Sequence, residues 1–401
     1  MQLSKALHNF VEKSLQNAGI RATKINAVLD MTNSLLNDSG LTLTGIGRNL
    51  PGETDSKHKI KRVDRWLGNS SLHKESQNIY KAVFYDLLRQ RKKLEILVDW
   101  SGCCNWTESC LRASLVYSGR SITIYQEVHS SKEQQKECVH KRFLKNLKNM
   151  IHKDCEVVII TDRGFGYSWF KMVRRLGWDF LGRSPSFVHY QLRDSDAWEP
   201  IRNLYMNSSN NQKYIGKALV GKSRKQRMEV FLYSYKGLPK NRRAHRTRNK
   251  PMYSCLNKQY REMNTTPWIL ITSLKETKGG NDNIVKSYAK RMQIEQNFRD
   301  DKNERWGFSM QFSRTKTPER INVLLMLVAI ASFVLMLIGV ASETLQLHKR
   351  FQANTVKTRR VLSLITLAKE VLRRIKNHLK LVDLIDALKK MGRGESYEFA
   401  T

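Results

Sequence analysis

One stretch of the sequence decides the fold, and it begins with Leu94-Glu95-Ile96-Leu97-Val98-Asp99, in which the apolar run 94–98 ends at an aspartate. The segments that follow are, in order, a β-rich run at 110–117, a tight turn at 118–120, a β-rich run at 121–128, a helix-forming stretch at 132–150, an apolar run at 157–161, a helical stretch at 168–176 and an apolar run at 178–181. Short apolar runs separated by turn residues are typical of strands. The sequence therefore predicts an α/β fold in the order strand, strand, strand, helix, strand, helix, strand.

The charge of the chain indicates a polyanionic partner. Its 401 residues include 71 Lys and Arg against 36 Asp and Glu, a formal net charge of +35. Positive charge spread over the whole length is typical of nucleic-acid binding, whereas a membrane-surface protein concentrates it beside an apolar face. The alternative is a solvated basic surface without function, which an excess of this size disfavours because it opposes compaction.

The cysteines and the first residues bear on the compartment. The six cysteines show neither a C-x-x-C pair nor His partners at metal-ligand spacing, so zinc binding and a disulfide framework are not predicted. The first sixteen residues carry charges too closely spaced for the apolar region of a signal peptide. We therefore expect reduced thiols and a cytoplasmic protein.

One segment is long and apolar enough to cross a bilayer. Residues 321–341 contain no charged side chain over 21 positions. A membrane span and a buried core helix both fit that length. The polar residues Asn322 and Ser332, the lack of flanking aromatic residues and the basic chain around the segment favour a core helix.

Two basic segments are candidates for contact with nucleic acid. In the first, residues 57–69, basic side chains share a helical face that lies opposite an apolar one, as in a helix that lies on DNA. The second is the run 236–250, predicted to be a basic loop. The residues singled out in these segments are His58, Lys61, Arg62, Arg65, Arg242, Arg243 and Arg246. Ordinary solvated surface is the alternative for both segments.

Two aspartates directly follow apolar runs of the α/β stretch. Asp99 follows the run 94–98, and Asp162 follows the run 157–161. Ligands bind at the carboxyl-terminal edge of the strands in an α/β sheet, and neighbouring strands would bring both carboxylates to one cation. An Asp after a buried strand is also commonly a loop or cap residue, so the pair requires a third partner.

That partner is Glu295, in a segment predicted to form one helix from about 283 to 305. At about 100° per residue, Tyr288, Arg291, Glu295 and Lys302 fall within an arc of roughly 60°. The alternative is a solvated helix in which Arg291 and Glu295 form an i, i+4 ion pair.

These residues carry a resemblance to a known family. The four side chains fit Y-x2-R-x3-E-x6-K, the signature of the DDE transposases of insertion sequence family four. Residues 98–101 and 162–165 are similar to the first and second Asp motifs of that family. The resemblance also includes residues 43–51, 58–65 and 351–355, so it covers essentially the whole chain.

The resemblance implies a fold and a chemistry. The fold is a ribonuclease-H-like catalytic core, a mixed five-stranded sheet with helices, with a β-rich insertion before the Glu295 helix. Asp99, Asp162 and Glu295 would hold two Mg²⁺ ions, for which Mn²⁺ can substitute, to activate the nucleophile and stabilise the leaving oxygen of phosphoryl transfer. The implied activity is cut-and-paste transposition, with excision through a DNA hairpin and joining to target DNA.

DNA contacts and partners also follow from the resemblance. Tyr288, Arg291 and Lys302 would grip phosphates near the hairpin, and Arg163 belongs to the same DNA-binding set. Active assemblies of the family are dimers on two DNA ends, so we expect a homodimer on double-stranded DNA at the bacterial nucleoid, without a membrane partner. Some relatives carry a Trp after the motif Arg to stack on an extruded base. This chain has Met292 there, which leaves Trp100 or Trp306 as candidates.

The predicted domains are an N-terminal helical DNA-binding domain at 1–92, the first part of the catalytic domain at 93–184, an inserted, mostly β module with the basic loop at 185–275, the second catalytic part at 276–345 and a C-terminal helical region for dimerisation at 346–401. Two other functions share these features. One is a ribonuclease-H-like nuclease without joining activity, and the other is a non-catalytic, sequence-specific DNA-binding protein.

Overall fold

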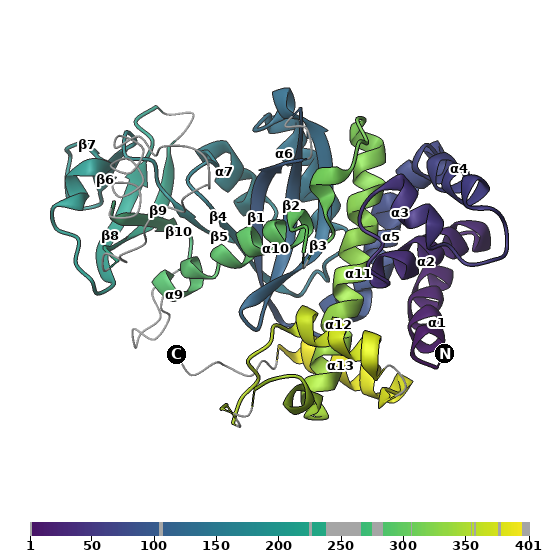
Figure 1. Cartoon of the computed structure of the whole chain (residues 1–401). Helices are drawn as coiled ribbons and strands as arrows, with labels where there is room; N and C mark the ends of the chain where they lie inside the picture. The colour runs from purple at the N-terminus through teal and green to yellow at the C-terminus, as the bar shows by residue number, and fades with distance from the viewer. Residues whose placement is uncertain are drawn as a thin grey trace, which may run out of the picture. The chain divides into compact units, whose positions relative to one another are not determined.

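The computed structural model of the chain describes residues 2–103, 107–223, 227–237, 266–274, 284–305, 307–353, 355–356, 358–375 and 378–394. The chain divides into two units (Figure 1). Unit 1 comprises Met1–Glu156 and Met292–Thr401, and unit 2 comprises Val157–Arg291. Helices and β-sheet are mixed along the described chain, which confirms the α/β class.

The first part of unit 1 is helical, as predicted. Its helices are α1 (Gln2–Asn17), α2 (Ala22–Leu36), α3 (Leu43–Arg48), α4 (Ser56–Leu67) and α5 (Ser70–Arg89). The short helix α3 begins after Thr42, whose hydroxyl accepts a hydrogen bond from the Gly45 N–H at 3.0 Å and caps the helix. In α4, Val63 and Leu67 are buried, so the predicted apolar face packs into unit 1.

The strands of unit 1 form an antiparallel sheet. They are β1 (Lys93–Gly102), β2 (Glu108–Tyr117) and β3 (Arg120–Ser130), with β2 between the other two. The turn between β2 and β3 places Ser118 at φ 44° and Gly119 at φ 73°, the left-handed pair that a tight hairpin requires. The short helix η1 (Ser131–Glu133) and α6 (Glu137–Lys148) follow, so the predicted order of elements is confirmed up to this point.

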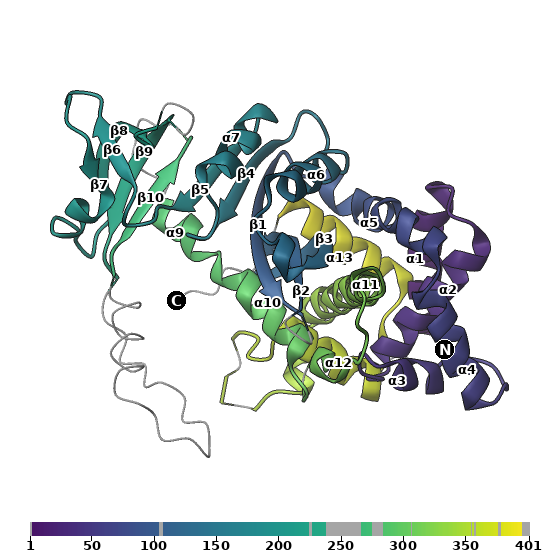
Figure 2. The ribbon, with the colours of Figure 1, turned by 90° about the horizontal axis from the view of Figure 1, so that it is seen from above.

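The core of unit 1 is built around α11 (Pro318–Thr344). This helix is long and apolar enough to cross a membrane by length and composition, but 94% of its most apolar window is buried inside the protein. It contacts α2, α5, β3, α12 (Leu364–Arg374) and α13 (Leu381–Arg393), and Figure 2 shows it end-on among these elements. The predicted buried core helix is therefore confirmed.

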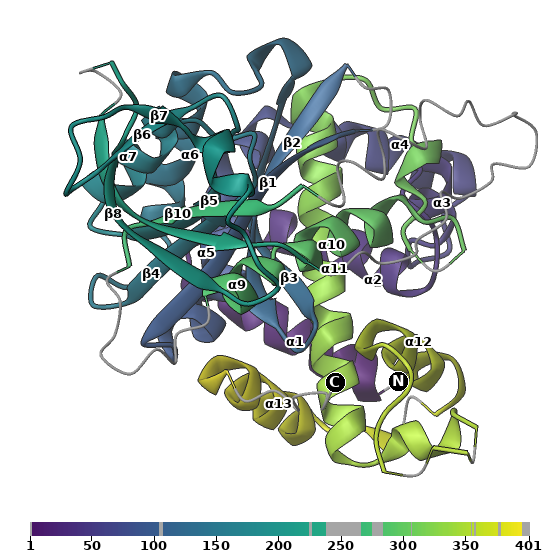
Figure 3. The same ribbon diagram turned by 90° about the vertical axis from the view of Figure 1, so that its left-hand side faces the viewer.

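A glycine in α11 explains one of these contacts. A Cβ at Gly339 would lie 2.4 Å from the carbonyl oxygen of Leu364, so a larger residue would push α12 away. Figure 3 shows α12 and α13 beside α11. The short helices η3 (Met310–Phe312) and η4 (Leu347–Arg350) lie before and after α11 in the chain.

Unit 2 contains a mixed sheet with the strand order β4-β5-β10-β9-β8-β6-β7. Only β4 and β5 pair in parallel among the described strands of this unit. The elements are β4 (Glu156–Thr161), α7 (Tyr167–Arg175), β5 (Asp179–Arg183), β6 (His189–Leu192), β7 (Glu199–Pro200), η2 (Ile201–Tyr205), β8 (Lys213–Val220), β9 (Met228–Tyr235), β10 (Trp268–Thr272) and α9 (Ile284–Ala289). The helix and two strands from β4 to β5 complete the predicted order.

The predicted single helix around Glu295 is wrong. The chain forms α9, which ends at Ala289, and α10 (Met292–Lys302), with a two-residue turn between them. The N–H of Arg291 donates to the carbonyl oxygen of Tyr288 at 3.0 Å, three residues back, so the hydrogen-bond pattern tightens and the α-helix is interrupted. The boundary between the two units falls at the same place.

Candidate active site

In unit 1, Asp99 lies inside strand β1 rather than at its end. Residues 100–102 continue the strand and pair with residues 109–111 of β2, which corrects the prediction that the strand stops before Asp99. The ladder with β2 holds this part of the backbone extended although the apolar run 94–98 has ended. Asp99 is therefore presented from a rigid strand, with Arg112 directly opposite it in β2.

Helix α10 contacts the same face of the unit 1 sheet. Ser101 is two residues from Asp99, so the two side chains share a face of β1. The ammonium group of Lys302 donates to the Ser101 hydroxyl at 2.9 Å. Glu295 and Lys302 are seven residues apart, which is close to two turns, and thus lie on one stripe of α10. The structure brings Glu295 and Lys302 to the face of the sheet that carries Asp99.

Trp100 belongs to the opposite face of β1. Its indole N–H donates to Nε2 of His140 in α6 at 3.2 Å, and its ring meets that of His129 edge-on at 5.8 Å. Burial lowers the pKa of His140 to about 4, so the imidazole is neutral and can accept this bond. Trp100 is held away from the Asp99 face, which leaves it poorly placed to stack on a base there. Met292 is 45% exposed, and Trp306 lies outside the described residues.

In unit 2, Asp162 directly follows β4, as predicted. Its Oδ1 accepts a hydrogen bond from the Gly164 N–H at 2.7 Å, which fixes the start of the turn into α7. Asp162 is half-buried, and Arg163 beside it is exposed. This arrangement leaves one carboxylate and one basic side chain at the end of the strand.

Tyr288 and Arg291 lie near Asp162 in unit 2. Tyr288 is 4% exposed, its ring packs edge-on against Trp268 at 5.0 Å, and the Arg291 guanidinium lies 6.0 Å from the ring centre. Burial raises the pKa of Tyr288 to about 12, and the charge of Asp162 adds to the rise while Arg291 and Arg183 oppose it. The phenol is therefore a neutral hydrogen-bond donor among charged groups.

Arg183, at the end of β5, was not predicted from the sequence. Burial lowers its pKa, and the positive charges of Arg163 and Arg291 lower it further, so three arginines share this part of unit 2. Its guanidinium donates to the carbonyl oxygens of Thr266 and Pro267 at 3.4 and 3.3 Å. The signal in the sequence was an Arg at the end of an apolar strand.

The three predicted carboxylates come from both units, Asp99 and Glu295 from unit 1 and Asp162 from unit 2. Among the described residues, no three His, Cys, Asp or Glu side chains form a group that could hold a metal ion. The chemistry of the predicted set suits Mg²⁺, because all of its donors are carboxylate oxygens.

The first predicted DNA-binding segment, residues 57–69, lies wholly among the described residues. His58, Lys61 and Arg65 are exposed on α4, whereas Arg62 is half-buried and lies 3.7 Å from the carboxylate of Asp30. Three of the four predicted basic residues of α4 are therefore exposed, and their contact with DNA stays a prediction. Arg242, Arg243 and Arg246, in the predicted basic loop, lie outside the described residues.

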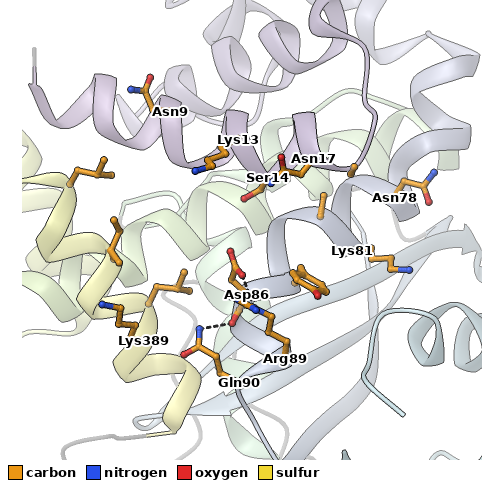
Figure 4. Close-up of a pocket in the computed structure, with 16 residues that line it drawn as sticks. Asn9, Lys13, Ser14, Asn17, Asn78, Lys81, Asp86, Arg89, Gln90 and Lys389 are labelled. Atoms are coloured by element: carbon orange, nitrogen blue, oxygen red, sulfur yellow. Dashed lines mark hydrogen bonds and ion pairs between the residues drawn. The ribbon is translucent and has the colours of Figure 1, made fainter. Parts of the chain in front are cut away.

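A pocket of about 910 Å³ opens among α1, α5 and α13 of unit 1 (Figure 4). Basic side chains line it together with apolar ones, among them Lys13, Lys81, Lys389, Leu381 and Ile385. Neither Asp99 nor Glu295 contributes to it, so this pocket is not the candidate active site.

Comparison with known protein families identifies the chain. A family model described as the transposase DDE domain matches residues 88–334, which is more than half of the chain and includes all three predicted carboxylates. The chain belongs to this family of DDE transposases, enzymes that act on DNA. Proteins of this family generally use divalent metal ions. No curated protein was found to match the chain.

Proposed function

We propose that this transposase moves its element by cut-and-paste transposition, as a member of insertion sequence family four related to the transposase of transposon ten. The enzyme binds the ends of its insertion sequence, excises it through a DNA hairpin and joins it to target DNA. The observation that carries the proposal is the contact of Lys302 with Ser101, because it brings the Glu295 stripe of α10 to the Asp99 face of β1.

We assign the chemistry to Asp99, Asp162 and Glu295 within a ribonuclease-H-like core. Their carboxylates would hold two Mg²⁺ ions, which supply Lewis acid chemistry for phosphoryl transfer when they are bound. The protein contributes rigid presentation: Asp99 from a paired strand, Asp162 from a turn fixed by Gly164, and Glu295 from a helix. Each successive cutting and joining step would reuse these three groups.

The basic residues of both units are assigned to DNA. Tyr288, Arg291 and Lys302 would bind phosphates near the cut end. In unit 2, Arg183 lies close to Tyr288, Arg291 and Arg163. A forked guanidinium suits phosphate recognition, and a buried, protonated phenol can donate to a phosphate oxygen. The exposed basic face of α4 would contact the duplex outside the reacting end.

The proposal also includes dimerisation through the C-terminal region, within the domain boundaries predicted from the sequence. We assign residues 346–401 to contacts between two copies on two DNA ends. In α13, Leu381 is 40% exposed, Val382 54% and Ile385 38%, which is an apolar surface that a second copy could cover. The site of action would be the bacterial nucleoid, in the cytoplasm.

The test of the proposed function uses labelled duplexes that cover the DNA on both sides of the gene. With Mg²⁺ the wild-type protein is expected to nick one junction, and pre-cut ends are expected to be joined to target DNA. Glu295→Ala is expected to reduce nicking by about 10³-fold or more while binding to the duplex persists.

The matched control is Glu304→Ala, which removes an exposed glutamate just after α10 and should leave nicking intact. Persistent nicking by Glu295→Ala would remove Glu295 from the catalytic set. Cutting without any joined product would instead indicate a nuclease, and binding without cutting by the wild-type protein would indicate a non-catalytic DNA-binding protein.

A further inference from the structure

Arg112 is a cation buried at the centre of unit 1. It lies in β2 directly opposite Asp99, and only 1% of it is exposed. Directly opposite residues of an antiparallel pair place their side chains on the same face of the sheet, with Cβ atoms about 4.5 to 5.5 Å apart. Arg112 therefore stands beside the predicted catalytic Asp99, on the face that α10 contacts.

The guanidinium of Arg112 holds α10 at two points. One Nη donates to Oδ1 of Asn297, and the other donates to Oδ2 of Asp301 at 2.5 Å. These two residues are one helical turn apart, so the forked group spans a turn of the helix. The guanidinium also lies 4.3 Å from the centre of the Phe298 ring.

Further hydrogen bonds fix both sides of this contact. The third donor of Arg112, Nε, donates to Oε1 of Gln126 in β3 at 2.8 Å. Asn297 accepts from the Thr123 hydroxyl at 3.0 Å and donates to the Ser121 carbonyl oxygen at 3.1 Å. The helix is thereby tied to β2 and β3 by side chains that are all largely buried.

The charge of the pair is balanced inside the protein. Burial lowers the pKa of Arg112, but the negative charge of Asp301 and the hydrogen bond to it outweigh that effect and raise the pKa above its ordinary value. A buried ion pair of this kind is a costly way to stabilise a fold, because apolar residues of similar volume often stabilise it at least as well. A fixed geometry is what the fork supplies and an apolar contact does not.

We propose that Arg112 is a positioning residue that sets the distance between Asp99 and Glu295, and so prepares the two carboxylates to share divalent ions. The proposal rests on the proposed function. Asn297 is two residues beyond Glu295, so a shift of the turn from Asn297 to Asp301 would move the Glu295 carboxylate relative to β1. Arg112, which lies directly opposite Asp99 in β2, holds that turn against the strand.

The test measures Mn²⁺ binding to the protein on pre-cut DNA ends by electron paramagnetic resonance. The Asp99→Asn complex supplies the background from ions bound elsewhere. Arg112→Lys, which keeps the buried charge but not the fork, is expected to raise the half-saturating Mn²⁺ concentration by about tenfold, and Arg112→Met by more. Affinity for the DNA ends should stay within about twofold of wild type, and saturating Mn²⁺ should partly restore the joining rate of Arg112→Lys.

The matched control is Lys24→Met. Lys24 is 6% exposed and donates from Nζ to Oε1 of Glu75 at 2.5 Å, so this variant removes a buried ion pair of unit 1 whose two partners lie in α2 and α5. This variant should bind Mn²⁺ like the wild type. If Arg112→Met fails to fold, Arg112→Lys alone carries the test.

The outcomes separate the two proposals. Equal Mn²⁺ binding by wild type and Asp99→Asn would overturn the proposed metal site itself. The positioning role of Arg112 would be overturned, and the proposed function would stand, if Mn²⁺ binding above that background were unchanged in Arg112→Lys. The same conclusion would follow if Lys24→Met changed it as strongly as Arg112→Lys.

Discussion

The two halves of the Y-x2-R-x3-E-x6-K motif are held in different ways. Glu295 and Lys302 lie on α10, which buried hydrogen bonds from Arg112 and Thr123 connect to the unit 1 sheet. Tyr288 and Arg291 belong to unit 2, where the phenol ring packs against the ring of Trp268. Helix α9, which carries Tyr288, ends at Ala289 and does not continue into α10. Fifteen consecutive residues thus belong to two structural environments.

This difference fits the separate roles that we propose for the two halves of the motif, metal binding and phosphate binding. A carboxylate that shares a metal ion tolerates little displacement, and the helix of Glu295, to which we assign this role, is fixed by several directional, buried contacts. Groups that bind phosphates act through charge and reach, which tolerate more variation in position. A two-residue turn between the halves allows each to be supported by its own unit.

The largest expected effect is on the free energy of unfolding, and it should differ between two adjacent carboxylates of α10, Asp301 and Asp300. Asp301→Ala removes the carboxylate that pairs with the buried Arg112. Because the guanidinium is then buried without that charge, we expect the free energy of unfolding of the protein to fall by about 3 to 5 kcal/mol. Chemical denaturation followed by circular dichroism measures this change. A loss below about 1 kcal/mol would mean that the buried pair does not hold α10.

Asp300→Ala is the matched control for that measurement. Asp300 pairs with Arg120 at 2.7 Å, but the two side chains are 28% and 25% exposed. Because water screens such a pair, its removal should cost about 1 kcal/mol or less. Equal losses in the two variants would contradict the special role given to the buried carboxylate.

The elements of the fold were predictable where local chemistry decides them. The hairpin at Ser118 and Gly119 follows from residues that tolerate positive φ, and the core helix follows from an uncharged run that the rest of unit 1 covers. Asp162 was placed correctly because its strand ends where the apolar residues end. In each case neighbouring residues carry the signal.

The remaining features depend on contacts between distant segments. Residues 284–302 contain neither Gly nor Pro, so nothing in the local sequence marks the interruption between α9 and α10. Asp99 lies inside its strand because β2 continues to pair beyond it. The role of Arg112 depends on Asn297 and Asp301, more than 180 positions away in the sequence. Such pairings can be read only from the folded chain.

A smaller effect is expected from Tyr288 and Arg291, the half of the motif to which we assign phosphate binding. Arg291→Ala should weaken binding to pre-cut ends by about 1 to 3 kcal/mol and reduce the slope of log affinity against log salt by about 1, because one phosphate contact is lost. Fluorescence anisotropy over a salt series measures both quantities. Lys286→Ala, an exposed cation on α9, should change them less. An unchanged slope in Arg291→Ala would contradict a phosphate contact.

The smallest effect concerns the ionisation of Tyr288. Its pKa, raised to about 12 by burial, keeps the phenol protonated in the folded protein, whereas an unfolded tyrosine ionises near pH 10. The contribution of this group to stability is therefore complete below about pH 10 and is lost as the pH rises towards 12. Tyr288→Phe should slow joining by about tenfold or less and leave the shape of the pH profile unchanged between about pH 7 and about pH 9.5. If the substitution removed a limb of that profile, the phenol would be an acid or base in the reaction, and the phosphate-binding half of the motif would share in the chemistry assigned to the carboxylates.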